Sequence, residues 1–298
     1  MMSNSYPKHA FARASSVIIT LATLLFRIGL SAQNSTNVVR YNVKGVFLES
    51  HDNRRKAVIR HETIPGYMDA MTMPFNVKRP DELGALKSGD EITFRLNVTD
   101  TEDWIDEIRR TGTIGFVVAP PPAPGSDVAE LEPGAAVPGC VLTNQSGKAF
   151  RLDEFKGQAL AFTFFFSRCP LPTYCPRMNN NLGTVQTALQ ADATHTNWQL
   201  LSISFDPQFD TPAQLAGHAA LYHADTNHWN FATGSPEVIR QLSGAFGLMV
   251  IPDGASFSHN LRTVVVDATG RVQKVFTDNE WAPGELANEM RNAMSHQP

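Results

Sequence analysis

Residues 160–178 read LAFTFFFSRCPLPTYCPRM, and this stretch decides the fold of the second half of the chain. Its first seven residues, 160–166, form an apolar run of the kind found in buried strands. The residues that follow predict a helix, because apolar side chains recur on one helix face: Met178, Leu182, Val185 and Leu189. Between strand and helix lies a proline-rich loop that carries two cysteines, Cys169 and Cys175.

The two cysteines of this loop predict a reactive or metal-binding pair. Pro176 fits the first position of the helix, so Cys175 lies at the helix start, where free N–H groups and the helix dipole lower the pKa of a thiol. Thiolates select Cu(I) or Zn(II) over hard cations, so copper is preferred and zinc stays open. The loop spacing fits a structural disulfide between Cys169 and Cys175 equally well. The third cysteine, Cys140, is interpreted as a small buried apolar residue without a role.

Farther along the chain, strand and helix patterns alternate. A strand is predicted at 200–205 (LLSISF), followed by a helix capped by Asp210. Two more helices are predicted at 236–246 and 283–294, around strands at 262–267 and 271–276 that are joined by a turn. The second half therefore predicts an α/β domain with a mixed sheet.

Three segments of this domain resemble the Sco/SenC family of thioredoxin-fold copper proteins. They are the cysteine loop, SISFDPQFDTP at 202–212, and FSHNLRTVVVDATGRV at 257–272, which contains His259. The resemblance, over about 138–294, implies that Cys169, Cys175 and His259 bind copper and deliver it to a respiratory oxidase. The family's usual spacing is C-x3-C, whereas this loop has the wider spacing C-x5-C. A peroxiredoxin would need Thr three residues before the first cysteine, where Phe166 stands.

The first half of the chain carries the pattern of a small all-β domain. Strand-like segments lie at 38–49, 56–61, 91–98 and 104–109, and the third of them alternates apolar and polar residues. A run rich in proline, APPPAPG at 119–125, follows and predicts an extended, semi-rigid spacer. The composition therefore places a domain boundary between the two halves.

Residues 61–75, HETIPGYMDAMTMPF, bring one histidine and three methionines close together. If residues 71–73 are extended, Met71 and Met73 share one face, and the turn at Pro65 and Gly66 can return His61 to that face. Thioether and imidazole ligands suit Cu(I) or Ag(I) and suit hard ions poorly. The alternative is that these methionines only fill a core.

This segment resembles the CusF-type periplasmic copper-binding domain, a small OB-like β-barrel. The resemblance covers about 38–112, and it implies that His61, Met71 and Met73 are copper ligands. That type places a Trp over the metal shortly before the methionines. No Trp stands there in this chain, so Tyr67 or Met68 is the candidate for that position, and Met68 is also a candidate fourth ligand.

The first residues of the chain predict export. Basic residues precede an apolar run at 17–26, and small residues up to Ala32 offer a cleavage site, so 1–32 is interpreted as a signal peptide. An uncleaved membrane anchor is the alternative, although Arg27 interrupts the run. We expect a periplasmic or other extracytoplasmic location. The formal net charge of −4, with no run of Lys and Arg, argues against nucleic acid as a partner.

Taken together, the sequence predicts a mixed fold, with an OB-like barrel at 38–114, a spacer at 115–137 and a thioredoxin-like α/β domain at 138–298. The predicted function is that of an exported copper chaperone, with no catalytic turnover. It would bind Cu(I), with Cu(II) as a further state, and pass it to a copper-accepting protein such as a subunit of cytochrome c oxidase. The alternatives are a thiol-disulfide oxidoreductase that uses Cys169 and Cys175, and a passive metal buffer.

Overall fold

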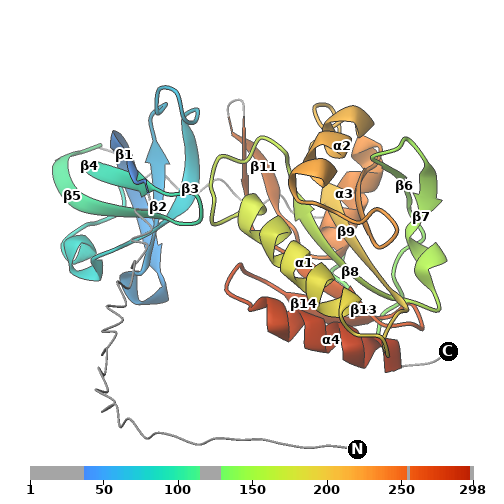
Figure 1. Ribbon diagram of the computed structural model, residues 1–298. Coiled ribbons are helices and arrows are strands. Elements are labelled where there is room, and N and C mark those ends of the chain that lie inside the picture. The colour runs from blue at the N-terminus through green and yellow to red at the C-terminus, as the bar shows by residue number, and fades with distance from the viewer. Residues whose placement is uncertain (1–36, 115–128, 254–255, 296–298) are drawn as a thin grey trace, which may run out of the picture. The chain divides into compact units, whose positions relative to one another are not determined.

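The computed structural model describes residues 37–114, 129–253 and 256–295. The predicted signal peptide or anchor at 1–32 and the proline-rich part of the spacer at 115–128 lie outside these residues. Among the described residues, no helix combines the length and the apolar character needed to cross a membrane. The described residues form an all-β domain followed by an α/β domain (Figure 1).

The first domain is a five-stranded antiparallel sheet with the strand order β3-β2-β1-β4-β5. Its strands are β1 (Val39–His51), β2 (Lys56–His61), β3 (Met71–Asn76), β4 (Asp90–Val98) and β5 (Asp103–Thr113). Two short 3-10 turns, η1 (Asp52–Arg54) and η2 (Pro80–Leu83), connect them. Directly after β3, Val77 forms a parallel bridge with Ile105 of β5, so the two edge strands of the sheet meet. The predicted small OB-like barrel is confirmed.

The sheet can curl because its strands are irregular at defined points. The register shifts between Phe47 and Glu49 of β1, and β4 and β5 also pair with register shifts, which increases local twist. At Gly45 of β1, a Cβ would lie 2.7 Å from a methyl carbon of Ile59 on β2, so the close approach of these strands requires glycine. In β4 the predicted alternation holds, and Ile92, Phe94, Leu96 and Val98 are all buried.

The second domain contains a seven-stranded sheet with the order β14-β13-β8-β9-β10-β6-β7. The strands are β6 (Val141–Asn144), β7 (Ala149–Arg151), β8 (Ala159–Phe165), β9 (Trp198–Ser204), β10 (Trp229–Thr233), β13 (Thr263–Val266) and β14 (Val272–Phe276). A 3-10 turn, η3 (Leu152–Phe155), precedes β8. Strands β8, β9 and β10 run parallel and the other pairs antiparallel, which confirms the predicted mixed sheet.

Helices cover both faces of this sheet. They are α1 (Cys175–Gln190), α2 (Pro212–Leu221), α3 (Pro236–Ala245) and α4 (Pro283–Ser295). On β8, Phe162 and Phe164 contact Phe246 at the end of α3, whereas Phe165 contacts His218 of α2. Because successive strand residues point to opposite faces, α3 and α2 lie on opposite sides of the sheet.

Helices α1 and α4 lie side by side (Figure 1) on the same face as α2. The Gln186 side chain of α1 donates to the backbone oxygen of His223, just after α2. The Arg291 guanidinium of α4 donates to the backbone oxygen of Ala188 in α1. The face of α1 predicted to be apolar, which comprises Met178, Leu182, Val185 and Leu189, is buried against the sheet.

Two local predictions differ from the structure. The cap of α2 is Thr211, which forms a reciprocal capping box with Gln214, and not Asp210. Residues 131–137 were assigned to the spacer, yet the N–H groups of Leu131, Gly134 and Val137 donate to backbone oxygens of the second domain. Backbone hydrogen bonds therefore attach this described part of the spacer to loops and strands of the α/β domain. The domain boundaries themselves stay a prediction.

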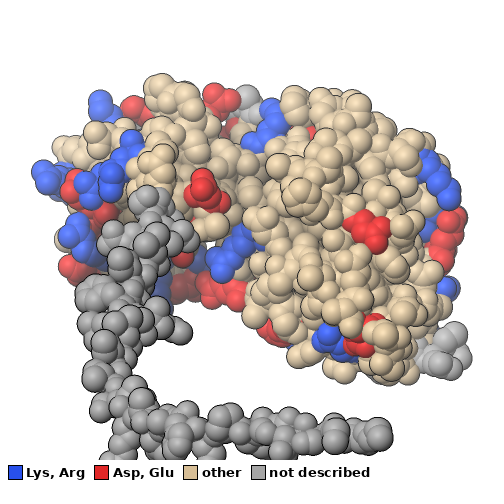
Figure 2. Space-filling model, in the orientation of Figure 1, with Lys and Arg blue, Asp and Glu red and all other residues tan. Residues whose placement is uncertain are grey.

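Charged side chains of both signs are interspersed on the face of the molecule seen in Figure 2. Among the described residues, Arg95 pairs with Asp106 and Lys274 pairs with Glu285. Surface ion pairs of this kind contribute little to stability, commonly less than about 1 kcal/mol. Neighbouring charges of opposite sign weaken any long-range field from this face.

Candidate metal centre

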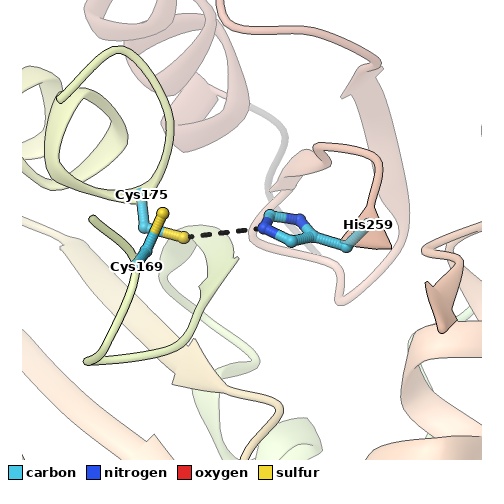
Figure 3. Close-up of side chains that lie close together, drawn as sticks. All are labelled: Cys169, Cys175 and His259. Atoms are coloured by element: carbon cyan, nitrogen blue, oxygen red, sulfur yellow. Dashed lines mark hydrogen bonds between the residues drawn. The ribbon is translucent and has the colours of Figure 1, made fainter. Parts of the chain in front are cut away.

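Three metal-ligating side chains from distant parts of the chain meet in the second domain. Cys169 lies in the loop after β8, and Cys175 is the first residue of α1. His259 is the last residue of β12 (Ser256–His259), which pairs with β11 (Val250–Asp253) as a hairpin. The two sulfur atoms and a ring nitrogen of His259 lie within 4.8 Å of one another (Figure 3). The structure therefore brings together the three residues that the sequence singled out in this domain.

The imidazole of His259 is oriented toward the thiols. Its Nδ1 lies 2.7 Å from the backbone oxygen of Asn260, a distance at which Nδ1–H donates to that oxygen. Nε2 then faces the Cys175 sulfur, 3.9 Å away. The ring packs between aromatic side chains, with Phe205 and Phe166 centred 4.9 and 5.7 Å away. Backbone hydrogen bonding and packing thus fix the ring with Nε2 toward the thiols, as second-shell contacts do for many metal-ligating histidines.

The two thiols differ in acidity. Burial acts to raise the pKa of Cys169, but hydrogen bonds from Cys175 and His259, with the charge of His259, outweigh it and hold this pKa well below its usual value. Burial, followed by the hydrogen bond and charge of the neighbouring Cys169, raises the pKa of Cys175 well above its usual value. The predicted lowered pKa of Cys175 is therefore wrong. Its sulfur is buried beside a thiolate, and these effects outweigh the helix dipole.

The helix start also differs in detail from the prediction. Cys175 occupies the first position of α1, and Pro176 follows it within the first turn. All three cysteines of the chain are free thiols in the structure, so the disulfide between Cys169 and Cys175 is not formed here. Cys140 is half-buried, and burial raises its pKa to about 11. It takes no part in the cluster of three, consistent with the role of a small packed residue.

The cysteine loop is held in place by buried carboxylates. Asp210, fully buried, accepts hydrogen bonds from the backbone N–H and the hydroxyl of Ser167 and from the hydroxyl of Ser204. The guanidinium of Arg168 pairs with Asp206 at 2.6 Å. These contacts fix the backbone just before Cys169. Asp210 is a positioning residue that the sequence analysis interpreted as a helix cap.

The donor set fits a soft or borderline metal ion. Thiolate sulfur binds an ion such as zinc at about 2.3 Å and imidazole nitrogen at about 2.0–2.1 Å, so three donors around one ion lie about 4 Å apart. The observed separations, up to 4.8 Å, need only a small contraction to reach that arrangement. Two sulfurs and one imidazole favour Cu(I) or Zn(II) over Mg²⁺ or Ca²⁺.

The barrel brings together its own predicted donors. In the pairing of β2 with β3, His61 lies opposite Met71, and Ile59 lies opposite Met73. Met71 and Met73 stand two residues apart on one strand, so both lie on the face shared with His61. All three side chains are buried. The predicted approach of His61 to the methionines is present, and strand pairing across the intervening loop produces it.

One nitrogen of His61 is free to bind a ligand. Nδ1 lies 2.7 Å from the backbone oxygen of Glu62, so Nδ1–H donates and Nε2 keeps its lone pair. Nε2 is buried and has no hydrogen-bond partner among the described residues. Burial, partly offset by the Glu62 hydrogen bond, lowers the pKa of His61 and favours the neutral ring. A buried, unpaired acceptor beside two thioethers is the donor arrangement that a soft metal requires.

The two candidates for the missing Trp have other contacts. Tyr67 stacks on Tyr41 with ring centroids 4.8 Å apart, and its hydroxyl donates to the backbone oxygen of Pro170 in the cysteine loop. Met68 is buried in the barrel core, where it bridges Ile64. Their role over a metal stays a prediction, as does Met68 as a fourth ligand.

The cysteine loop also forms hydrogen bonds with the barrel. The sequence did not predict these contacts. Besides the bond from Tyr67 to Pro170, the Thr173 hydroxyl donates to Asp103 of β5, and the Tyr174 hydroxyl donates to the backbone oxygen of Pro74 at 3.4 Å. The partners are 70 to 103 residues apart along the chain. No local pattern links residues at such separations, so only the folded chain reveals these contacts.

Both domains match known protein families. Residues 130–295, more than half of the chain, match the SCO1/SenC family model. This chain belongs to the SCO1/SenC family. Residues 40–110 match the model of the copper binding periplasmic protein CusF. Both predicted resemblances are confirmed, a thioredoxin-like Sco domain preceded by a CusF-like barrel.

Individual relatives cover the second domain. The SCO1 protein homolog of Bacillus subtilis is 29% identical over 155 residues, which are 50% of this chain and 78% of that protein. The structure of BsSco, a member of the Sco family of cytochrome c oxidase assembly proteins, is 27% identical and covers 56% of this chain and 98% of its own, with a TM-score of 0.49. Copper-bound ScoI of Bradyrhizobium japonicum is 25% identical, covers 55% and 99%, and has a TM-score of 0.45.

Proposed function

We propose that this SCO1/SenC protein is an extracytoplasmic copper chaperone that binds Cu(I) through Cys169, Cys175 and His259. The observation that supports this most is the convergence of two thiols and one imidazole within 4.8 Å, with His259 Nε2 directed at the thiols. One thiol of low pKa supplies a ready thiolate, which soft ions prefer. The fixed orientation of His259 places Nε2 as the third donor without rearrangement of the ring.

The barrel is the second copper-binding element in this proposal. His61, Met71 and Met73 form a buried set with one unpaired imidazole nitrogen, and the matching family model is that of a periplasmic copper-binding protein. Export through residues 1–32, with or without retention as an anchor, would place the protein where CusF-type proteins act. The acceptor we propose is a copper site of a respiratory oxidase, in keeping with membership of a family that includes BsSco.

Copper loading of defined variants tests the proposal. Protein purified without oxygen is titrated with Cu(I), and bound copper is measured against a chelator of known affinity. We expect Cys169→Ser with Cys175→Ser to remove the tightest Cu(I) binding while the fold is retained. We expect His259→Ala to weaken this binding less, because two thiolates remain. Cys140→Ser is the matched control, since Cys140 lies outside the cluster. Unchanged tight binding in the double variant would reject the site, and tighter binding of Zn(II) would reassign the metal.

A thiol-disulfide oxidoreductase is the second candidate, and the unequal acidity of the two cysteines favours it. A thiolate at Cys169 beside a protonated thiol at Cys175 is the arrangement of an attacking and a resolving cysteine. In this function Cys169 would attack a disulfide of a partner, and Cys175 would then release the product by forming the disulfide with Cys169.

The two candidates predict different results in a thiol-exchange assay. The reductase should reduce a disulfide peptide with the reactivity of Cys169. His259→Ala should slow this reduction without abolishing it, because both thiols stay but the His259 contribution to the low pKa of Cys169 is lost. A copper chaperone should bind Cu(I) more weakly in the same variant, but should still bind it through the two thiolates. Rapid disulfide exchange without stoichiometric Cu(I) binding would select the oxidoreductase.

A further inference from the structure

A small cavity is lined by candidate copper ligands from both domains. Met71 and Met73 of β3 form one part of its wall, and Cys169 and His259 form another. Its volume is about 20 Å³. A cavity needs a volume of about 10–15 Å³ to hold one water molecule, so this cavity has room for one ion and not for two.

Contacts on both sides hold the walls of the cavity together. Leu171, next to Pro170 in the cysteine loop, is 5% exposed and packs into the hydrophobic core of the barrel. Cys169 and Tyr174 pack against the cores of both domains. The hydroxyls of Tyr67 and Tyr174 add hydrogen bonds between the loop and the barrel on either side of Leu171. The cysteine loop is therefore seated on the barrel directly beside the methionines.

The chemistry of the wall selects the occupant. Two thioethers, one thiol and one imidazole are the donors that the wall provides, and the remaining lining includes Phe166, Tyr174 and Leu171. Sulfur donors favour Cu(I) and disfavour hard cations, and an apolar wall leaves little room for competing water. A Cu(I) ion in this cavity would therefore take its ligands from the two domains together.

We propose that Met71 and Met73 of the barrel and Cys169 of the Sco domain share one Cu(I) ion in this cavity. This inference rests on the proposed copper function and extends it, because the two predicted sites become neighbouring ends of one path. On the barrel side, His61 pairs with Met71 across two strands, and on the other side Cys169 and His259 of the cavity wall cluster with Cys175.

Copper would move along this path by ligand exchange. A bond from Cu(I) to the Cys169 sulfur forms as a bond to one methionine sulfur breaks, and any proton on the Cys169 thiol passes to the solvent. Copper stays Cu(I) throughout, so no oxidant or reductant is needed. The ion is never released into bulk water between the two ligand sets.

The affinity for the first equivalent of Cu(I), measured on the full chain by chelator competition, tests this sharing. If the sites are independent, Met71→Ile with Met73→Ile leaves this affinity unchanged, because the cysteines alone set it. If the ion is shared, we expect the double variant to lower the affinity at least tenfold. The swap roughly conserves volume and should leave the fold intact, which circular dichroism verifies.

Met290→Ile is the matched control, because Met290 is a fully buried methionine that does not line the cavity and is not a candidate ligand. It should leave the first affinity unchanged. X-ray absorption of selenomethionine-labelled protein with one equivalent of Cu(I) should show copper–selenium and copper–sulfur scattering together, and the Met71→Ile, Met73→Ile variant should lose only the selenium contribution.

Two negative outcomes can be distinguished. If the unaltered chain binds Cu(I) tightly and Met71→Ile with Met73→Ile changes neither affinity nor scattering, the sharing is wrong and the proposed copper function stands. If the unaltered chain fails to bind Cu(I), the proposed function is wrong and the sharing fails with it.

Discussion

Thr173, two residues before Cys175, donates its hydroxyl to the carboxylate of Asp103 on β5. The backbone oxygen of Thr173 accepts a second hydrogen bond, 2.7 Å long, from the side chain of Asn279. Asp103 is 3% exposed, and its Oδ2 has no hydrogen-bond partner among the described residues. Burial, only partly opposed by hydrogen bonds from Thr173, raises the pKa of Asp103 to about 6.

This raised pKa predicts how Asp103 couples stability to pH. The folded state holds the Asp103 proton up to about pH 6, whereas the unfolded chain releases it near pH 4. Between these values the folded state binds more protons, so the contribution of Asp103 to the free energy of unfolding falls as pH rises, by about 3 kcal/mol in all. Chemical unfolding measured from pH 4 to pH 7 gives this dependence.

Asp103→Asn isolates that contribution, because other carboxylates act in the opposite sense. The pKa of Asp192, for example, is lowered to about 2 by its hydrogen bond to Arg291. The difference in stability between the unaltered chain and Asp103→Asn should therefore change with pH only between about 4 and 6. A difference that stays constant over this window would show that Asp103 titrates normally and that the buried contact is not maintained in solution.

A second prediction concerns Asp210. Asp210→Ala removes the acceptor for Ser167 and Ser204 and leaves buried donors unpaired, so we expect the free energy of unfolding to fall by about 3 kcal/mol. Because the Ser167 backbone precedes the cysteine loop, Cu(I) affinity should fall as well. Asp153→Ala, at a partly exposed carboxylate that pairs with Arg151, is the control and should lower the free energy of unfolding much less, because exposed ion pairs contribute little. If Asp210→Ala and Asp153→Ala lowered the free energy of unfolding equally, Asp210 would not hold the cysteine loop in place.

A third prediction follows from the unequal thiols. Under limiting iodoacetamide, without metal, Cys169 should be alkylated before Cys175 and Cys140, because the thiolate is the reactive species. Greater exposure could also make Cys169 the first thiol to be alkylated. The pH dependence of the alkylation rate distinguishes this explanation from a lowered pKa. The Cys169 rate should stay high at a pH where an ordinary thiol is largely protonated, as peptide mass spectrometry would measure. A Cys169 rate that rises tenfold per pH unit through neutrality would contradict the lowered pKa.

The sequence predicted those parts of the molecule that local pattern determines. The apolar run 160–166 and the helix face from Met178 predicted β8 and α1, because burial on one side of a regular element repeats with a fixed period. The donor residues were found for a different reason. Cysteine, methionine and histidine in close spacing are chemically distinctive, and their family resemblance is confirmed at the level of both domains.

The rest depended on contacts between distant residues. The acidity of Cys169 and Cys175 could not be predicted from the helix start alone, because each thiol is set by the other and by His259, 84 residues after Cys175. Asp210 resembled a cap by sequence, but its carboxylate turns to the loop after β8. The seating of the cysteine loop on β3 and β5 likewise has no signal in either segment by itself.

The final prediction uses protons to distinguish the two ligand sets. The cysteine set is measured in Met71→Ile with Met73→Ile, and the methionine set in Cys169→Ser with Cys175→Ser, both as full chains. The slope of log Cu(I) affinity against pH equals the number of protons that copper displaces. Thioethers displace none, so only His61 can contribute a slope in the methionine set.

Burial lowers the pKa of His61, and Nδ1 already donates to Glu62, so Nε2 is available without loss of a proton. The methionine set should therefore show a slope near zero from about pH 6.5 to 8. In the cysteine set, the raised pKa of Cys175 means that copper must displace its proton, so we expect a slope of at least about one over the same range. Chelator competition, corrected for protonation of the chelator, measures both slopes. Equal slopes would mean that one ligand set is wrong, and a cysteine set with no slope would show that Cys175 does not bind the metal as a thiolate.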